Sequence, residues 1–147
     1  GNPISHSKSP SIHTLFAEQT QQSMHYTAIQ VDTGGFNNAV GNFVATGGKG
    51  LNITVPFKEE AWVLVTKRSD RAEGAGAVNT IKIEKDGLFG ENTDGVSLVN
   101  DWTVNHGIEL RGKNILLMGA GGAARGVLMP LLNQKPSINF KRLYLTY

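Results

Sequence analysis

Apolar positions along the chain recur with two different spacings. Over 12–16 and 36–44 the apolar residues stand three to four positions apart, which places them on one face of a helix. Over 25–31 and 51–55 they alternate with polar residues or form short apolar runs, as in strands. Continued along the chain, the same patterns predict further helices over 57–67 and 95–106 and further strands over 77–83, 88–91, 114–118 and 141–147. A last helix is predicted to follow the glycine-rich stretch at 119–124 and to continue to about residue 133.

Residues with special backbone preferences mark the ends of these elements. Ser9 is the predicted N-cap of the first helix, because its hydroxyl could accept an unpaired N–H group there. The Gly47-Gly48 pair is predicted to end the second helix. Asp86-Gly87 is typical of a hairpin turn and joins two of the predicted strands.

The order of these elements indicates an α/β fold. Strands and helices alternate over the first 90 residues, which is typical of βαβ units with a mostly parallel sheet, and the hairpin adds one antiparallel pair. Only two strands and one helix follow Leu110, whereas a doubly wound nucleotide-binding domain needs about six strands. The chain also starts without a methionine, so we expect it to be incomplete at both ends.

Composition narrows the class of protein. The 147 residues carry a formal net charge of +2 and include no cysteine, which excludes disulfides and thiolate metal sites. His13, His25 and His106 lack ligand-like spacing, so we expect no metal. Positive charges are spread along the chain, which argues against nucleic-acid binding. No run of about 18 apolar residues occurs, so we expect no membrane span and a cytoplasmic protein.

A glycine-rich sequence follows the predicted strand over 114–118. Gly119-x-Gly121-x-x-Ala124 matches the dinucleotide fingerprint, in which glycine allows a tight turn and the close approach of a pyrophosphate. The unpaired N–H groups of the following helix would face the phosphate oxygens. The alternative is a plain glycine-rich turn between a strand and a helix. The residue that distinguishes NAD from NADP is expected about 20 positions later, at the end of this chain.

Polar residues gather at predicted strand ends in the first region. Asn52 and Thr54 point to the same side of one strand. Lys58 follows that strand closely, and Asp94 follows another strand. Because the carboxyl ends of parallel strands meet at one edge of a sheet, we expect Thr54, Lys58 and Asp94 to lie near one another. Lys58 and Asp94 are a candidate proton-transfer pair; the alternatives are a solvated lysine and a helix-capping aspartate.

Five stretches together resemble the shikimate dehydrogenase family. They are GNPISHSKSP at 1–10, GLNITVPFK at 50–58, GAGAVNT at 74–80, GENTDG at 90–95 and GAGGA at 119–123, in the family's order. The resemblance implies a substrate-binding domain over 1–94, a connecting helix over 95–109 and, over 110–147, the first part of a Rossmann-type NADP-binding domain. It implies reversible NADPH-dependent reduction of 3-dehydroshikimate to shikimate, a step of aromatic amino acid (chorismate) biosynthesis, and is compatible with a homodimer.

The resemblance also implies roles for individual residues. Lys58 and Asp94 look like the catalytic pair. The implied substrate ligands are Ser7, Ser9, Asn52, Thr54 and Asn79, and the implied cofactor-binding residues are Gly119, Ala120, Gly121, Gly122, Ala123 and Asp70. The family's Asn-Arg pair for NADP would begin at Tyr147, where this chain has a tyrosine and ends, so the sequence leaves NADP and NAD open.

Two alternatives to this function stay open. One is a quinate/shikimate dehydrogenase of the same fold that uses NAD. The other is a catalytically silent module that binds a hydroxylated carboxylate; the presence of both Lys58 and Asp94 argues against it. A lysine at a helix N-terminus is disfavoured by the helix dipole, whereas Glu59 and Glu60 suit it, which favours a functional reason for Lys58.

Overall fold

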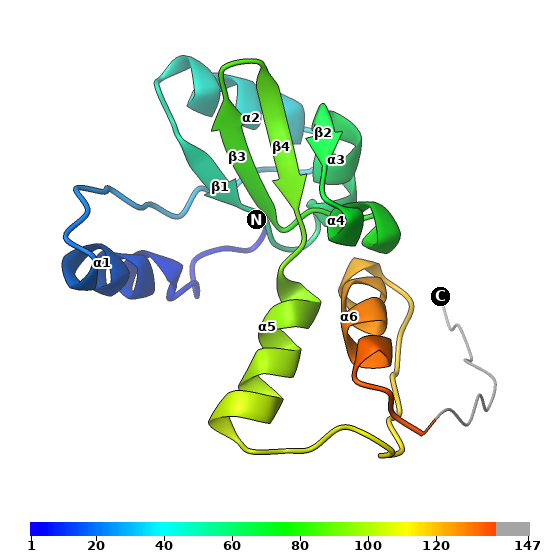
Figure 1. Ribbon diagram of the computed structural model, residues 1–147. Helices are drawn as coiled ribbons and strands as arrows, with labels where there is room; N and C mark the ends of the chain where they lie inside the picture. Colours follow the sequence, from blue (N-terminus) through cyan, green and yellow to red (C-terminus); the bar gives the residue numbers. More distant parts are fainter. Residues whose placement is uncertain (138–147) are drawn as a thin grey trace.

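A computed structural model describes residues 1–137 and contains a four-stranded sheet (Figure 1). The strand order is β1-β3-β4-β2. β3 pairs with both β1 and β4 in antiparallel orientation, and β2 pairs with β4 in parallel orientation. The strands are β1 (Gly50–Asn52), β2 (Lys67–Arg68), β3 (Thr80–Glu84) and β4 (Gly87–Glu91).

The predicted α/β class and the predicted hairpin are confirmed. β1, β2 and β4 run in one direction, and β3 alone runs the opposite way between β1 and β4. The hairpin turn at Asp86-Gly87 reverses the chain, with Gly87 at a φ of 141°. Because the reversed strand lies inside the sheet, it makes two of the three strand pairs antiparallel, although most strands share one direction.

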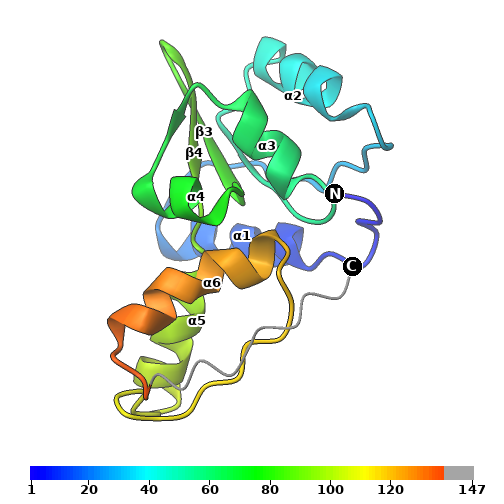
Figure 2. The ribbon, with the colours of Figure 1, turned by 90° about the vertical axis from the view of Figure 1, so that its right-hand side faces the viewer.

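Helices cover the sheet on one face and form a separate layer beneath it. α2 and α3 lie on the same face of the sheet, and α5 and α6 pack together below it (Figures 1 and 2). No helix in residues 1–137 is both long and apolar enough to cross a membrane. The helices are α1 (Ser9–Gln19), α2 (Phe36–Ala45), α3 (Lys58–Leu64), α4 (Asp70–Ala75), α5 (Asp94–Asn100), which continues as a π-helical turn over Asp101–Asn105, and α6 (Gly122–Asn133).

Each of these layers has its own apolar cluster. The larger one packs α2 and α3 onto the sheet, and its centre is the stacked pair Phe36 and Phe57, with ring centroids 5.2 Å apart. Phe57 is completely buried, which anchors the start of α3. The smaller cluster contains Val99 of α5 and Leu131 of α6 and fixes the lower helix pair.

Several element boundaries differ from the sequence prediction. Ser9 is the first residue of α1 and Lys8 is its N-cap, so the predicted N-cap role of Ser9 is wrong; the Ser7 hydroxyl accepts the Ser9 N–H group instead. The helix predicted over 57–67 ends at Leu64, because Val65 turns extended and leads into the short strand β2. The helix predicted from residue 95 starts one residue earlier, at Asp94.

Two predicted strands are absent from the described residues. The segment 25–31 has no ladder partner in the described residues; its backbone bonds only Gly1, through Ile29 and Val31, and its Tyr26 hydroxyl bonds Asn52. The segment 114–118 forms a single bridge, from Asn114 to Ser137, and Leu116 is 83% exposed. Both segments carry apolar residues suited to a sheet, but a strand also needs a neighbour for its backbone groups. The strand predicted over 141–147 lies outside the described residues.

Candidate functional site

Lys58 and Asp94 form a close ion pair at the start of two helices. Lys58 Nζ lies 2.7 Å from Asp94 Oδ2, and the two side chains are 19% and 25% exposed. Lys58 is the first residue of α3, and its carbonyl oxygen accepts the N–H group of Val78 at 2.8 Å. Asp94 is the first residue of α5, after Thr93 at the N-cap. The predicted proximity of Lys58 and Asp94 is thus observed, and the predicted capping alternative for Asp94 is not. Thr54, the third residue of that prediction, lines a hollow that the pair does not line.

Asn79 holds the Asp94 carboxylate from its other side. Its Nδ2 donates to Asp94 Oδ1 at 2.8 Å, and its Oδ1 accepts the Thr93 N–H group at 3.1 Å. The Asn79 backbone is fixed just before β3, because it donates to the Glu91 carbonyl and accepts from the Ile53 N–H group. Both carboxylate oxygens of Asp94 are therefore bound, which restricts its rotation.

A chain of hydrogen bonds runs from this pair across the start of β3 and the end of β1. The Thr80 hydroxyl donates to Asn79 Oδ1 at 3.0 Å, and Asn52 Nδ2 donates to Thr80 Oγ1 at 3.2 Å. Tyr26 then donates its hydroxyl to Asn52 Oδ1 at 2.9 Å. Thr80 and Tyr26 were not predicted site residues. Thr80 could have been found from its place beside Asn79 in the GAGAVNT stretch, but nothing in the sequence indicated Tyr26.

A hollow of about 250 Å³ lies at the far end of this chain. Burial raises the pKa of Tyr26, and a hydrogen bond involving Ser9 opposes that shift, so the phenol keeps its proton over the physiological range. Lys58, Asp94 and Asn79 do not line this hollow; the hydrogen bonds through Thr80 connect them to it. Its polar lining includes the predicted substrate ligands Ser7, Ser9, Asn52 and Thr54, together with Tyr26, His6 and His25.

Asn92, which was not a predicted site residue, holds the backbone of Asp94 in place. It is 1% exposed, and its Nδ2 donates to the Ala77 carbonyl at 3.0 Å. Its Oδ1 accepts the Asp94 N–H group at 3.2 Å. A buried amide with both ends bonded has one orientation available, so Asn92 fixes the start of α5.

The glycine turn has the backbone freedom that the fingerprint requires, although the segment 114–118 before it forms a single bridge and no strand. Gly119 has a φ of 113°, which only glycine adopts readily, and a Cβ at Gly121 would meet no atom within 4 Å. Gly121 is the N-cap of α6 and provides no side-chain cap. Within residues 1–137, the N–H groups of Gly122, Ala123 and Ala124 have no backbone acceptor. This open turn with unpaired donors at a helix start fits a pyrophosphate.

Asp70, the remaining predicted cofactor residue, lies apart from this turn. Asp70 is the first residue of α4, its side chain is exposed, and Ser69 caps the helix. No hydrogen bond or ion pair links it to the glycine turn in the described residues.

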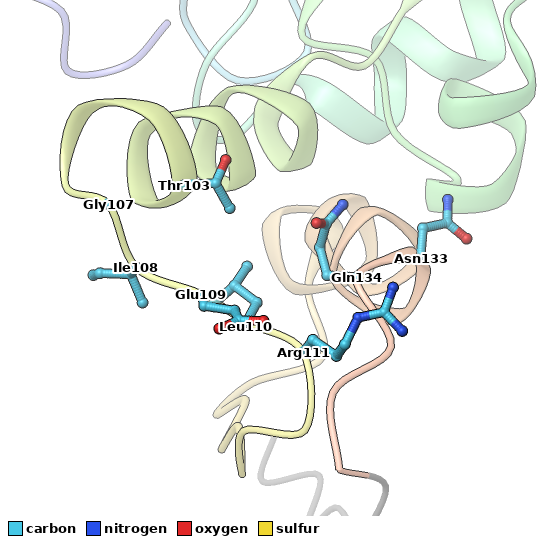
Figure 3. A pocket seen from close by; sticks show the side chains of 8 residues that line it. All are labelled: Thr103, Gly107, Ile108, Glu109, Leu110, Arg111, Asn133 and Gln134. Carbon is cyan, nitrogen blue, oxygen red and sulfur yellow. The ribbon is translucent and has the colours of Figure 1, made fainter.

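A second hollow, of about 350 Å³, lies between the end of the π-helical turn and the end of α6. Its one carboxylate, Glu109, and one guanidinium, Arg111, do not converge on a common point (Figure 3). None of the predicted site residues lines it. The lining residues are Thr103, Gly107, Ile108, Glu109, Leu110, Arg111, Asn133 and Gln134.

Comparison with known proteins matches this arrangement to one family. The family model described as the shikimate dehydrogenase substrate binding domain matches residues 1–81, which is more than half of the chain. The chain belongs to the shikimate dehydrogenase family. The matched range contains Lys58 and Asn79, and Asp94 follows it.

Individual relatives extend the likeness beyond that range. The shikimate dehydrogenase (NADP(+)) of Hahella chejuensis is 60% identical over 138 residues, which are 93% of this chain and 51% of that protein. An Ael1 enzyme from Pseudomonas putida has a crystal structure with a TM-score of 0.88 at 47% identity, covering 93% of this chain and 51% of that one.

A further solved structure contains both ligands. It is shikimate 5-dehydrogenase from Thermus thermophilus in complex with NADP(H) and shikimate, with a TM-score of 0.83 at 32% identity, covering 90% of this chain and 50% of that one. The chain therefore spans about half the length of the shikimate dehydrogenases it matches.

Proposed function

We propose that the protein carrying this sequence is an NADP-dependent shikimate dehydrogenase. It interconverts 3-dehydroshikimate and shikimate in aromatic amino acid biosynthesis, in the cytoplasm. The observation that carries the proposal is the pair of Lys58 and Asp94, 2.7 Å apart and held by Asn79. Family membership also supports the proposal, because the relatives are named shikimate dehydrogenases.

Lys58 is the proposed acid/base group. Reduction of a ketone needs a proton on oxygen while hydride reaches carbon, and the nicotinamide cofactor supplies that hydride when bound. An ammonium group has three N–H donors, and Asp94 takes one of them. The remaining donors can bond the ketone oxygen, stabilise its developing negative charge and deliver the proton. In the reverse direction the neutral amine of Lys58 accepts the hydroxyl proton.

Asp94 orients the lysine in this scheme. Its carboxylate is fixed by Asn79 and by the Asn92 contact to its backbone, so it presents one oxygen to Lys58. This arrangement keeps the ammonium pointed to one place before substrate arrives. A pre-oriented donor lowers the barrier more than a mobile one, because no reorganisation is needed in the transition state.

The proposed substrate site extends from the pair to the hollow beside Tyr26. Ser7 and Ser9 carry hydroxyls at the start of α1 that can donate to a carboxylate, and both line the hollow. Asn52 and Thr54 line it too and can bond ring hydroxyl groups. Asn79 lies between this set and Asp94, so it can contact the substrate near the reacting carbon.

The glycine turn is the proposed pyrophosphate site. The backbone N–H groups over 119–123 would bond the phosphate oxygens. Asp70 is proposed as a further cofactor contact by resemblance alone. The choice of NADP rests on the relatives, which are named for that cofactor. We assign residues 1–94 to substrate binding, 95–109 to a connection and 110–147 to the nucleotide-binding domain.

The test uses the full-length protein that carries this sequence. Purified protein is assayed with shikimate or quinate and with NADP⁺ or NAD⁺, by absorbance of the reduced cofactor. The proposal predicts the highest kcat/KM for shikimate with NADP⁺. Preference for quinate or NAD⁺ would favour the quinate/shikimate alternative. Calorimetric binding of shikimate without turnover of any combination of substrate and cofactor would indicate a catalytically silent binding module.

A further inference from the structure

Arg125 connects the glycine turn to two other segments of the chain. It lies in the first turn of α6, and its guanidinium donates three hydrogen bonds in different directions. Nη1 donates to the Ala120 carbonyl at 3.0 Å, Nε to the Ala75 carbonyl at 2.7 Å, and Nη2 to Glu59 Oε1 at 2.6 Å. A planar fork with five donors can hold three acceptors at fixed relative positions, which a flexible amine cannot do.

Each acceptor belongs to a backbone segment that carries residues of the candidate site. Ala120 belongs to the glycine turn itself. Glu59 follows Lys58 directly in α3. Ala75 ends α4, and after the left-handed Gly76 the chain enters the stretch that leads to Asn79. One side chain thus joins the turn to the backbone carrying Lys58 and to the backbone carrying Asn79.

The backbone contacts of α6 reach the other half of the pair. A Cβ added at Gly95, next to Asp94, would lie 2.4 Å from the Gly126 carbonyl oxygen. A Cβ added at Gly126 would lie 3.0 Å from Oδ1 of Asn92, the residue that bonds the Asp94 N–H group. The start of α6 is therefore seated directly behind Asp94, while Arg125 reaches around to α3.

We propose that Arg125 is a positioning residue, which fixes the glycine turn relative to the Lys58–Asp94 pair. This inference rests on the proposed function, since the turn and the pair must face the two reactants across a set distance. Arg125 is unlike a phosphate ligand, because three of its donors already bond acceptors of the protein and its charge is paired with Glu59. The Arg125–Glu59 pair is 39% and 63% exposed, so the two carbonyl contacts matter more than the charge.

The test compares three variants of the full-length protein. Arg125→Met keeps the side-chain stem and removes all three bonds; Arg125→Lys keeps the charge and loses the fork. Glu60→Gln is the matched control, because Glu60 adjoins Glu59 in α3 but its own carboxylate forms no ion pair in residues 1–137. We measure kcat, KM for shikimate, the NADPH dissociation constant by fluorescence, and hydrogen exchange of the peptides covering 57–60 and 75–80.

Arg125→Met is expected to lower kcat about 10- to 100-fold, because small displacements of reacting groups have effects of this size. The NADPH dissociation constant and the KM of Arg125→Met stay near the wild-type values, while hydrogen exchange rises in the two peptides. The kcat of Arg125→Lys lies between those of the wild type and Arg125→Met. Unchanged kcat and exchange would overturn the inference, and so would weaker NADPH binding with kcat intact, which would show a phosphate ligand. If the wild type oxidises no shikimate, the proposed function fails separately, and the exchange result still decides whether Arg125 links the segments.

Discussion

Lys58 Nζ and Asp94 Oδ2 lie 2.7 Å apart although the residues are separated by 36 positions in sequence. Each begins a helix, and the adjacent residues Val78 and Asn79 hold the two helix starts: the Val78 N–H group bonds the Lys58 carbonyl, and the Asn79 amide bonds the Asp94 carboxylate. The Asp94 carboxylate is bound on both oxygens, by Lys58 and by Asn79. The pair is therefore a fixed part of the folded chain.

Replacing Asp94 with asparagine tests whether its charge orients the lysine. Asp94→Asn keeps the side-chain shape and the contact with Asn79 but removes the negative charge facing Lys58. We expect kcat for shikimate oxidation by the full-length protein to fall about 10²-fold, with a smaller change in KM. Asp101→Asn is the control, because in residues 1–137 the contacts of the Asp101 carboxylate are with His106 and Asn105, which are exposed and lie outside the candidate site. Equal activity of both variants would exclude the orienting role.

Removing the Asn79 amide should weaken the fold as well as the site. Asn79→Ala leaves the Thr93 N–H group and Asp94 Oδ1 without their partner in a half-buried region. The expected loss in the free energy of unfolding is about 1–3 kcal/mol, measured by urea denaturation. Asn105→Ala removes an exposed amide contact with Asp101 and should change it by less than about 0.5 kcal/mol. A loss no larger than this control would mean that Asn79 does not stabilise the Asp94 helix start.

Close packing of α5 against α6 predicts that alanine is not tolerated at Gly95. Its Cβ would lie 2.4 Å from the Gly126 carbonyl oxygen and 2.7 Å from Pro130 Cγ. Gly95→Ala should therefore destabilise the protein by about 1–3 kcal/mol in thermal or urea unfolding. Gly41→Ala, in the exposed part of α2 with no atom within 4 Å, should stabilise it by up to about 1 kcal/mol. Stabilisation by both variants would contradict the close packing of α5 against α6.

Glu91 gives a pH dependence of stability with a definite sign. Desolvation raises the pKa of its carboxyl, but bonds from Ser69, Arg71 and the Asn92 N–H group outweigh it, so the pKa lies below its ordinary value of 4.5. A lowered pKa contributes stability that is present above 4.5 and is lost as the pH falls through the folded-state pKa. Between about pH 6 and pH 3, wild-type unfolding free energy should fall more steeply than that of Glu91→Gln. Parallel curves would contradict this.

Local sequence patterns predicted the elements whose partners are close in the chain. The hairpin of β3 and β4 follows from Asp86-Gly87 and the flanking alternation, because turn and strands are contiguous. The segments 25–31 and 114–118 have the same apolar character but no ladder partner in the described residues. Strand formation depends on distant neighbours, which a local pattern does not contain.

The site was predictable to the extent that its residues break local rules. Lys58 is unfavourable at a helix start, and this conflict with the helix dipole indicated a role beyond folding. Asn92 is compatible with an ordinary turn before a helix, so only its burial and its bonds to Ala77 and Asp94 reveal its function. Tyr26 joins the network through a contact across 26 residues, which no spacing rule predicts.

The most direct test of the central claim is the turnover number of Lys58→Ala in the full-length protein, with shikimate and NADP⁺ at saturation. If Lys58 transfers the proton, kcat falls by about 10²–10⁴-fold while the affinity for shikimate changes little. Lys85→Ala is the control, since Lys85 is an exposed lysine beside the hairpin turn and forms no ion pair in the described residues. A Lys58→Ala variant with the turnover number of this control would contradict the account.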